Sequence, residues 1–147
     1  LFAGFPNSYG TLGYALRLSG LAGEAVAMHL RAVRLLERVL GTDDSRVAMA
    51  LTNLGLAYAD AGRGSDAIEA QDRAHRIFRT ALGPRHASTL LAGRRLAVAL
   101  AAAGNHLRAR RLMSTILEAT EHRMEDNPAE RARIEADAAL VFGRNRV

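Results

Sequence analysis

The sequence predicts an all-α protein, an α-solenoid of about three helix pairs followed by one closing helix. Three observations predict this fold class. Apolar residues recur at the three- and four-residue spacing of amphipathic helices, no segment alternates as a β-strand would, and a set of residues repeats at a fixed step of 42 positions.

The 42-residue step organises the chain. Four columns of residues keep it: Gly20, Gly62 and Gly104; Ala25, Ala67 and Ala109; Leu12, Leu54 and Leu96; and Gly41 and Gly83, with Glu125 in the last place. Stacked repeats keep such a step because each unit packs in the same way on its neighbour, whereas an ordinary helical bundle has no reason to keep it. We expect one domain over residues 1–147, with repeats of about 6–47, 48–89 and 90–127 and a capping helix of about 128–142.

The helices are expected in pairs. The repeat places the first pair at about 8–19 and 22–40. Apolar positions 51, 54, 55, 58 and 61 predict a helix over 46–61, which Gly62 ends as a left-handed residue. Ser65 and Asp66 are the expected N-cap of a helix over 65–82.

The third pair follows at about 87–103 and 106–124. The last helix, over about 128–142, is expected to begin with Asn127 as its N-cap and Pro128 at its first position. Its charged residues alternate with Ala and Ile, a composition that suits the polar cap of a repeat array.

Short motifs within this pattern resemble a known family. Leu54-Gly55-x-x-Tyr58, followed by Ala67 and Ala74, is similar to the tetratricopeptide pattern of L-G-x-x-Y and two spaced alanines. The 42-residue period resembles the variant found in kinesin light chains and many bacterial regulators, whose linker reads L-G-x-x-H-P-x-T-L. Residues 82–90 read LGPRHASTL and follow that linker with Ala87 in place of proline, and residues 40–47 follow it loosely. The resemblance covers about residues 7–126 and implies a right-handed solenoid that binds proteins or peptides.

In a tetratricopeptide array the first helix of each pair lines a concave groove, so the resemblance implies a set of groove residues. By register these are Tyr14, Arg17, Met49, Thr52, Asn53, Leu56, Asp60, Leu91, Arg94, Arg95 and Val98. Asn53 matches the asparagine that contacts bound peptide in the family, whereas Thr11 and Arg95 take its place in the other units. Asn53 could instead bond a neighbouring helix, and Arg94 and Arg95 could be ordinary solvated residues. If they line the groove, an acidic peptide is the expected partner, because guanidinium pairs with carboxylates bidentately.

The composition excludes several classes of function. The chain has no Cys, which removes disulfides, thiolate chemistry and Cys-based zinc sites. No apolar run reaches the ~18 residues of a spanning helix and no secretory signal opens the chain, so we expect a cytoplasmic protein. All 20 basic residues are Arg, as in proteins of GC-rich genomes, and the net charge of +5 therefore largely reflects codon usage. Because the first residue is Leu1, we expect a fragment of a larger protein. The resemblance implies that this fragment is the sensor or scaffold part of a bacterial regulator.

No catalytic or metal-binding constellation is visible in the sequence. No two of the five histidines lie three or four residues apart, and His29, Gln71 and the methionine at 113 share one repeat column that indicates packing. His86 belongs to the linker and is expected to bond locally. No phosphate-binding loop or nucleophile elbow is present. We expect a non-catalytic protein with no cofactor and no metal.

Two alternative functions remain open. The apolar residues Leu1, Phe2 and Phe5 favour self-association through the ends of the solenoid. Rows of arginine on the second helices could follow a nucleic-acid backbone: Arg31, Arg34 and Arg38; Arg73, Arg76 and Arg79; Arg108, Arg110 and Arg111. Acids interrupt each row and aromatic residues are few, which makes nucleic acid the less favoured partner.

Overall fold

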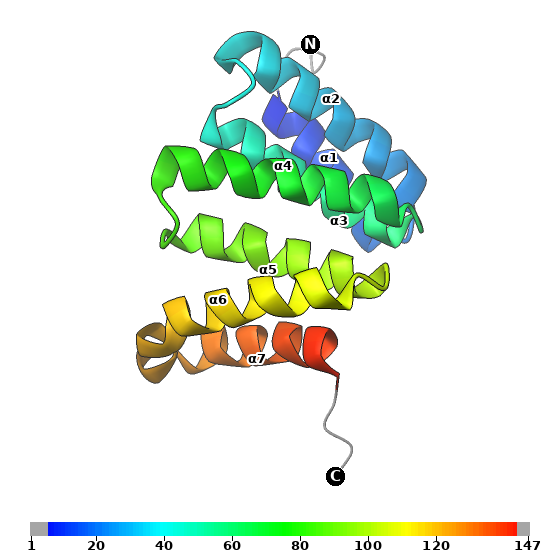
Figure 1. The fold of residues 1–147 in the computed structure, drawn as a ribbon. Coiled ribbons are helices and arrows are strands. Elements are labelled where there is room, and N and C mark those ends of the chain that lie inside the picture. The colour runs from blue at the N-terminus through cyan, green and yellow to red at the C-terminus, as the bar shows by residue number, and fades with distance from the viewer. Residues whose placement is uncertain (1–5, 144–147) are drawn as a thin grey trace.

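The computed structural model describes residues 6–143 of the chain, and these form seven α-helices and no strand (Figure 1). The helices are α1 (Pro6–Leu18), α2 (Ala22–Leu40), α3 (Ser45–Asp60), α4 (Gly64–Leu82), α5 (Ala87–Ala102), α6 (His106–Asp126) and α7 (Pro128–Phe142). Every boundary lies within two residues of the expected one. The prediction of an all-α solenoid is confirmed.

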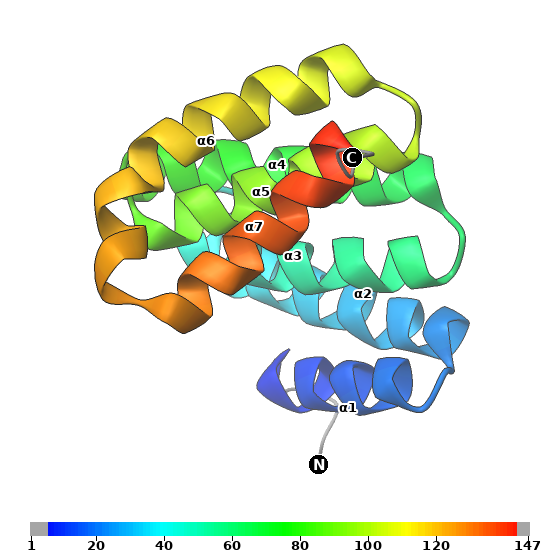
Figure 2. The same ribbon diagram turned by 90° about the horizontal axis from the view of Figure 1, so that it is seen from below.

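The helices stack as three antiparallel pairs, α1–α2, α3–α4 and α5–α6, with α7 at the end of the stack (Figures 1 and 2). Each helix packs on the next one in the chain, and the first helices of neighbouring units also touch, α1 with α3 and α3 with α5. The second helices α2, α4 and α6 lie toward the viewer in Figure 1 and form the outer wall. The first helices therefore share the opposite side of the stack.

The repeated glycines lie at helix ends, and the repeated alanines lie where the paired helices pack. Gly62 ends α3 with a φ of 74°, and the amide of Arg63 then donates to the carbonyl of Tyr58 at 2.8 Å, which closes a Schellman turn. Gly20 and Gly104 close the same turn after α1 and α5. The alanine column lies fully buried where the two helices of a pair approach most closely. The same turns and the same close helix contacts thus recur every 42 residues.

Two expectations about helix ends can be compared with the structure. Asn127 caps α7 as expected, since its side chain accepts a bond from the amide of Glu130 at 3.1 Å. The expected cap of α4 is wrong: α4 already begins at Gly64, directly after the turn at Gly62, so Ser65 and Asp66 lie inside its first turn. The Asp66 carboxylate instead accepts a bond from Nε of Arg63 at 2.8 Å. Leu1, Phe2 and Phe5 lie outside the described residues.

Helix α7 lies where a fourth unit would begin. It starts one repeat step after α5, to within one residue, and packs on both α5 and α6. Ile134 and Val141 are its buried residues, and Val141 joins the cluster of Leu96, Leu100 and Met113. This position places one face of α7 beside the first helices, where it contributes to the surface described next.

Candidate peptide-binding groove

Three adjoining cavities run along the first helices. The first, of about 400 Å³, lies between α1 and α3; the second, of about 300 Å³, between α3 and α5; and the third, of about 540 Å³, is bounded by α3, α5 and α7. Met49 and Asn53 line both the first and the second, and Leu91 and Arg95 line both the second and the third. Because neighbouring cavities share walls, they form one continuous groove.

The structure brings most of the expected groove residues together. Every one of them except Arg17 and Asp60 lines a cavity of this groove: Tyr14, Met49, Thr52, Asn53, Leu56, Leu91, Arg94, Arg95 and Val98. Tyr14, Met49 and Leu91 are exposed, whereas Leu56 and Val98 are half-buried. The groove therefore presents apolar surface along its length, which suits contact with the side chains of another polypeptide.

Arg17 and Asp60 pair with each other. Nη1 of Arg17 on α1 lies 3.1 Å from Oδ2 of Asp60 on α3, and the guanidinium also lies 5.9 Å from the centre of the Tyr14 ring. This ion pair bridges two first helices at the edge of the groove. Because each of these charges already has a partner, Arg17 and Asp60 are not the charged groups that would attract a ligand most strongly.

Arg94 lines the groove but is not the solvated residue of the alternative expectation. Only 8% of its surface is exposed, and its Nε lies 3.3 Å from Oδ2 of Asp137 on α7, as an ion pair rather than a hydrogen bond. Burial raises the pKa of the Asp137 carboxyl, and the positive charges of Arg94 and Arg95 oppose that rise. Arg94 is thus not a solvated residue: it joins α5 to α7, and it lines the third cavity with its charge already paired to Asp137.

Arg95 faces the groove next to Arg94. It is half-buried, lines the second and third cavities, and has no ion-pair partner within the described residues. Burial lowers the pKa of its guanidinium, and the nearby charges of Arg94 and Arg17 lower it further, against a smaller opposing effect of Asp137. A positive charge in this setting gains from a carboxylate brought by a ligand.

The two polar residues of α3 have different roles. Thr52 is buried, and its hydroxyl donates to the carbonyl of Ala48 at 3.0 Å while its own carbonyl accepts from Nε2 of Gln71 at 3.0 Å. Asn53 is exposed, and its side chain makes no hydrogen bond to the described part of the chain. The structure thus gives no support to the alternative in which Asn53 bonds a neighbouring helix.

Sequence reasoning missed the contribution of α7 to the groove. Arg133 and Asp137 line the third cavity beside Arg95. The signal was present, because one further repeat step carries the column of Asn53 and Arg95 to Asp137. The alternation of charged residues with Ala and Ile along this helix, which also suits a polar cap, obscured this signal.

The packing column predicted from His29, Gln71 and Met113 is confirmed. All three are buried on second helices. His29 lies against Gly13 and Gln71 against Gly55, and Met113 belongs to the same buried cluster as Ala97. His86 bonds locally as expected, since its Nδ1 accepts from the amide of Ser88 at 3.1 Å.

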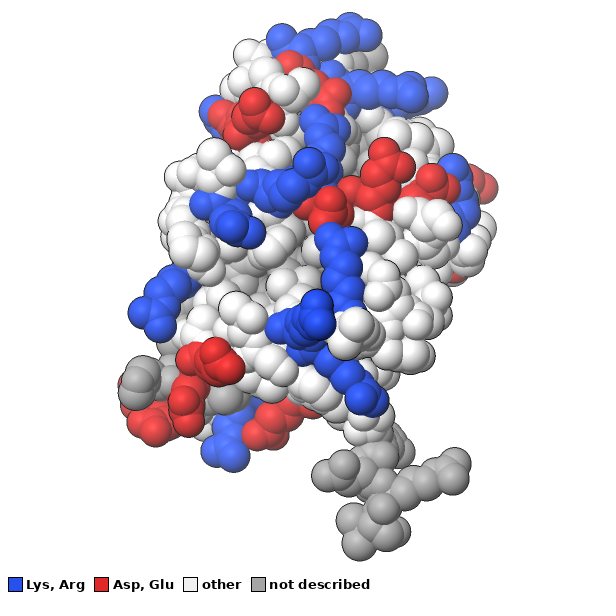
Figure 3. Space-filling model, viewed as in Figure 1, with Lys and Arg blue, Asp and Glu red and all other residues white. Residues whose placement is uncertain are grey.

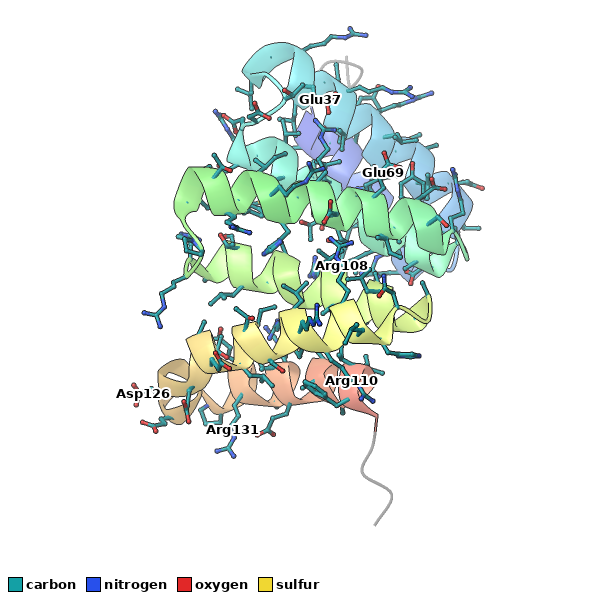
Figure 4. All side chains as sticks on the ribbon, viewed as in Figure 1. Glu37, Glu69, Arg108, Arg110, Asp126 and Arg131 are labelled. Carbon is teal, nitrogen blue, oxygen red and sulfur yellow. The ribbon has the colours of Figure 1, made fainter. Side chains whose placement is uncertain are left out.

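The outer wall carries mixed charge. Acidic and basic side chains alternate over α2, α4 and α6 (Figure 3). Glu37 on α2 pairs with Arg73 on α4 at 2.6 Å, and Asp72 on α4 pairs with Arg108 on α6 at 2.8 Å (Figure 4). These arginines are already paired with carboxylates, so they are less available to pair with the phosphates of a nucleic acid, which further disfavours that partner.

Comparisons with known proteins agree with this architecture. A family model for the tetratricopeptide repeat matches residues 5–70 and 46–122. The chain belongs to the tetratricopeptide repeat family. No curated protein matches the chain as a relative.

Solved structures of other tetratricopeptide proteins share its fold. A putative kinesin light chain with nearly identical TPR-like repeats from Podosopora anserina is 22% identical, with a TM-score of 0.78 over 94% of this chain and 70% of that chain. BtubC (BKLC) from P. vanneervenii is 16% identical, with a TM-score of 0.82 over 93% of this chain and 55% of that one. The expected likeness to kinesin-light-chain repeats is confirmed at the level of the fold.

The described residues lack two further kinds of feature. None of the described helices combines the length and the apolar character that crossing a membrane requires. Within the same part of the chain, no group of three or more His, Cys, Asp or Glu residues lies close enough to hold a metal ion.

Proposed function

We propose that this chain is a non-catalytic protein-interaction module whose groove binds an extended peptide segment of another protein through at least one carboxylate. The observation that carries the proposal is Arg95, a half-buried guanidinium without a carboxylate partner in the described chain, set in a continuous apolar groove. Membership of a repeat family of interaction scaffolds supports it.

The groove divides into subsites of different chemistry. Met49 and Leu91 flank Arg95 on one side, and Leu56 and Val98 flank it on the other. A ligand carboxylate can pair bidentately with the guanidinium while neighbouring apolar side chains cover these four residues. Asn53, one repeat step before Arg95, offers an amide for the ligand backbone.

The same proposal extends to cellular context. The chain acts in the cytoplasm as the sensor or interaction part of a larger bacterial regulatory protein. The family relation and the exclusive use of Arg, typical of GC-rich genomes, support this context. The single domain over residues 1–147, with its repeat boundaries, is part of the proposal.

A peptide array tests the proposal. The full chain is screened against peptides that differ in acidic and apolar content, and the best binders are titrated against wild type and Arg95→Asn, the residue that unit two has in this column. Acidic peptides should be enriched, should bind Arg95→Asn more weakly, and should bind wild type less well as salt rises, because screening shortens the reach of exposed charges.

A matched control is Arg38→Ala on the outer wall, an exposed arginine that lines none of the three cavities. It should leave the titration unchanged. If acidic peptides are not enriched, or if both variants behave alike, the proposed role of Arg95 is wrong.

A further inference from the structure

Two buried side-chain atoms in the described part of the chain have no hydrogen-bond partner, and both belong to residues that line the third cavity of the groove. One is Oε1 of Gln71 on α4, and the other is Nε of Arg94 on α5. Gln71 is only 2% exposed and Arg94 only 8%. Buried polar atoms without a partner are costly and therefore rare in folded proteins. Two of them in the walls of one cavity need an explanation that includes the cavity.

The amide of Gln71 reaches the wall of this cavity because α3 has a glycine beneath it. Nε2 of Gln71 donates to the carbonyl of Thr52 at 3.0 Å, so Oε1 lies on the other side of the amide group. Gly55 lines the same cavity, and a Cβ at this position would lie 2.7 Å from Cδ of Gln71. A larger residue in place of Gly55 would push the amide away from the cavity wall.

Arg94 contributes a hydrogen-bond donor to the same cavity. Its Nε lies 3.3 Å from Oδ2 of Asp137, but this ion pair is not a hydrogen bond and leaves the Nε–H group without an acceptor. The guanidinium groups of Arg95 and Arg133 line the cavity as well, whereas Asp137 is the one carboxylate among its described lining residues. The cavity is therefore positively charged overall.

These atoms select one kind of ligand side chain. The side chain must donate to an oxygen on α4 and accept from a nitrogen on α5. A carboxylate only accepts and cannot satisfy Gln71, while Lys and Arg only donate and would be repelled by the three arginines. A hydroxyl offers one oxygen for two partners on different helices, whereas the amide of Asn or Gln has its donor and its acceptor on separate atoms.

We propose that the third cavity is a specificity subsite for the side-chain amide of an Asn or Gln residue in a bound peptide. The ligand amide donates to Oε1 of Gln71 and accepts from Nε of Arg94, and Leu56 and Val98 contact its methylene groups. The cavity, of about 540 Å³, has room for this side chain and for the peptide backbone beside it. The subsite rests on the proposed function, in which Arg95 binds a carboxylate of the same peptide, and it adds a neutral residue near that acid.

Short peptides with a central Glu among Ala and Leu residues test the subsite. Each other position is set in turn to Gln, Asn, Met, Glu or Lys, and binding to the full chain is followed by fluorescence anisotropy. At one position, Gln or Asn should bind about three- to tenfold more tightly than Met, Glu or Lys, as expected for hydrogen bonds in a buried site.

Two variants of the chain assign this preference to the cavity. Gln71→Met, which introduces the residue type that the third unit has in this column, should remove the preference. Arg94→Lys keeps a positive charge beside Asp137 but lacks the Nε donor, and should reduce the preference. The matched control His29→Met changes the same column in the first unit and should leave the preference in place. Circular dichroism checks that each variant keeps its helical content.

The subsite is overturned if no position of the peptides prefers an amide in wild type, since water alone would then meet the two atoms. It is also overturned if Gln71→Met and His29→Met retain the same preference. Failure of the groove proposal is a separate result, in which Arg95→Asn and the exchange of the central Glu for Ala leave the affinity unchanged. An amide preference that Gln71→Met removes would support the subsite even then.

Discussion

Replacing Gly55 with alanine is expected to destabilise the chain, although alanine is the better helix former. Gly55 lies buried in the middle of α3 against Gln71 of α4. A Cβ built at Gly55 would lie 2.7 Å from Cδ and 2.9 Å from Cγ of Gln71, and closer still to its Nε2. Gln71 would have to move, and its hydrogen bond to the carbonyl of Thr52 would be lost.

The magnitude follows from opposing contributions. Alanine in place of glycine favours a helix by about 1 kcal/mol. Overpacking a buried contact costs about 1–3 kcal/mol, and loss of the Gln71 hydrogen bond costs about 1 kcal/mol. The net effect is a loss of about 1–3 kcal/mol in the free energy of unfolding, or about 2–12 °C in Tm for a chain of this size.

Urea and thermal unfolding followed by circular dichroism measure this change. Gly10→Ala in α1 is the matched control, because a Cβ there meets nothing within 4 Å and should only stabilise. The double variant Gly55→Ala/Gln71→Met, which gives the second unit the residue types that the third unit has in these two columns, Ala97 and Met113, should regain most of the lost stability. The reasoning is refuted if Gly55→Ala is as stable as wild type, or if the double variant recovers nothing.

Three further predictions concern stability. Ala67→Leu should overpack the close approach of α3 and α4 and cost about 1–3 kcal/mol, as a thermal melt would show; an unchanged Tm would argue against this register. Asn127→Ala should cost about 1 kcal/mol, because it removes the cap bond to the amide of Glu130. Urea unfolding can resolve this difference, and an unchanged midpoint of the urea transition would show that the cap does not stabilise the chain. Burial, with a smaller effect of Arg17, lowers the pKa of His29 in the folded chain. As the pH drops below the ordinary histidine pKa of about 6.5, the unfolded chain therefore binds this proton more readily than the folded chain, and the free energy of unfolding should fall. His29→Gln should reduce this loss between pH 7.5 and pH 5, and an identical loss in both proteins would contradict the assignment.

The sequence predicted the features that repeat. Gly62, the buried alanine column and the cap at Asn127 follow from local chemistry, because turns, close helix contacts and N-caps each need particular residue types. The period places the first helices on one face by register, and the resemblance to tetratricopeptide repeats is what assigned a groove to that face.

The features that depend on a single place in the stack could not be predicted. Arg94 stands in the column of Gly10 and Thr52, and only the packing of α7 on α5 buries it against Asp137. Its neighbour Arg95 has the same residue type and the opposite environment. Likewise, Asp66 has the chemistry of a cap, but the turn at Gly62 starts α4 two residues before it.

A double-mutant cycle between Arg95 and a ligand carboxylate tests the central claim most directly. An acidic peptide selected on the array is titrated calorimetrically, as its Asp or Glu form and as its Asn or Gln form, against wild type and Arg95→Asn. The groove account predicts a coupling of about 1–3 kcal/mol, as expected for a charge-assisted pair in a partly desolvated site. Additive effects, with no coupling between Arg95 and any acidic position of the peptide, would contradict the account.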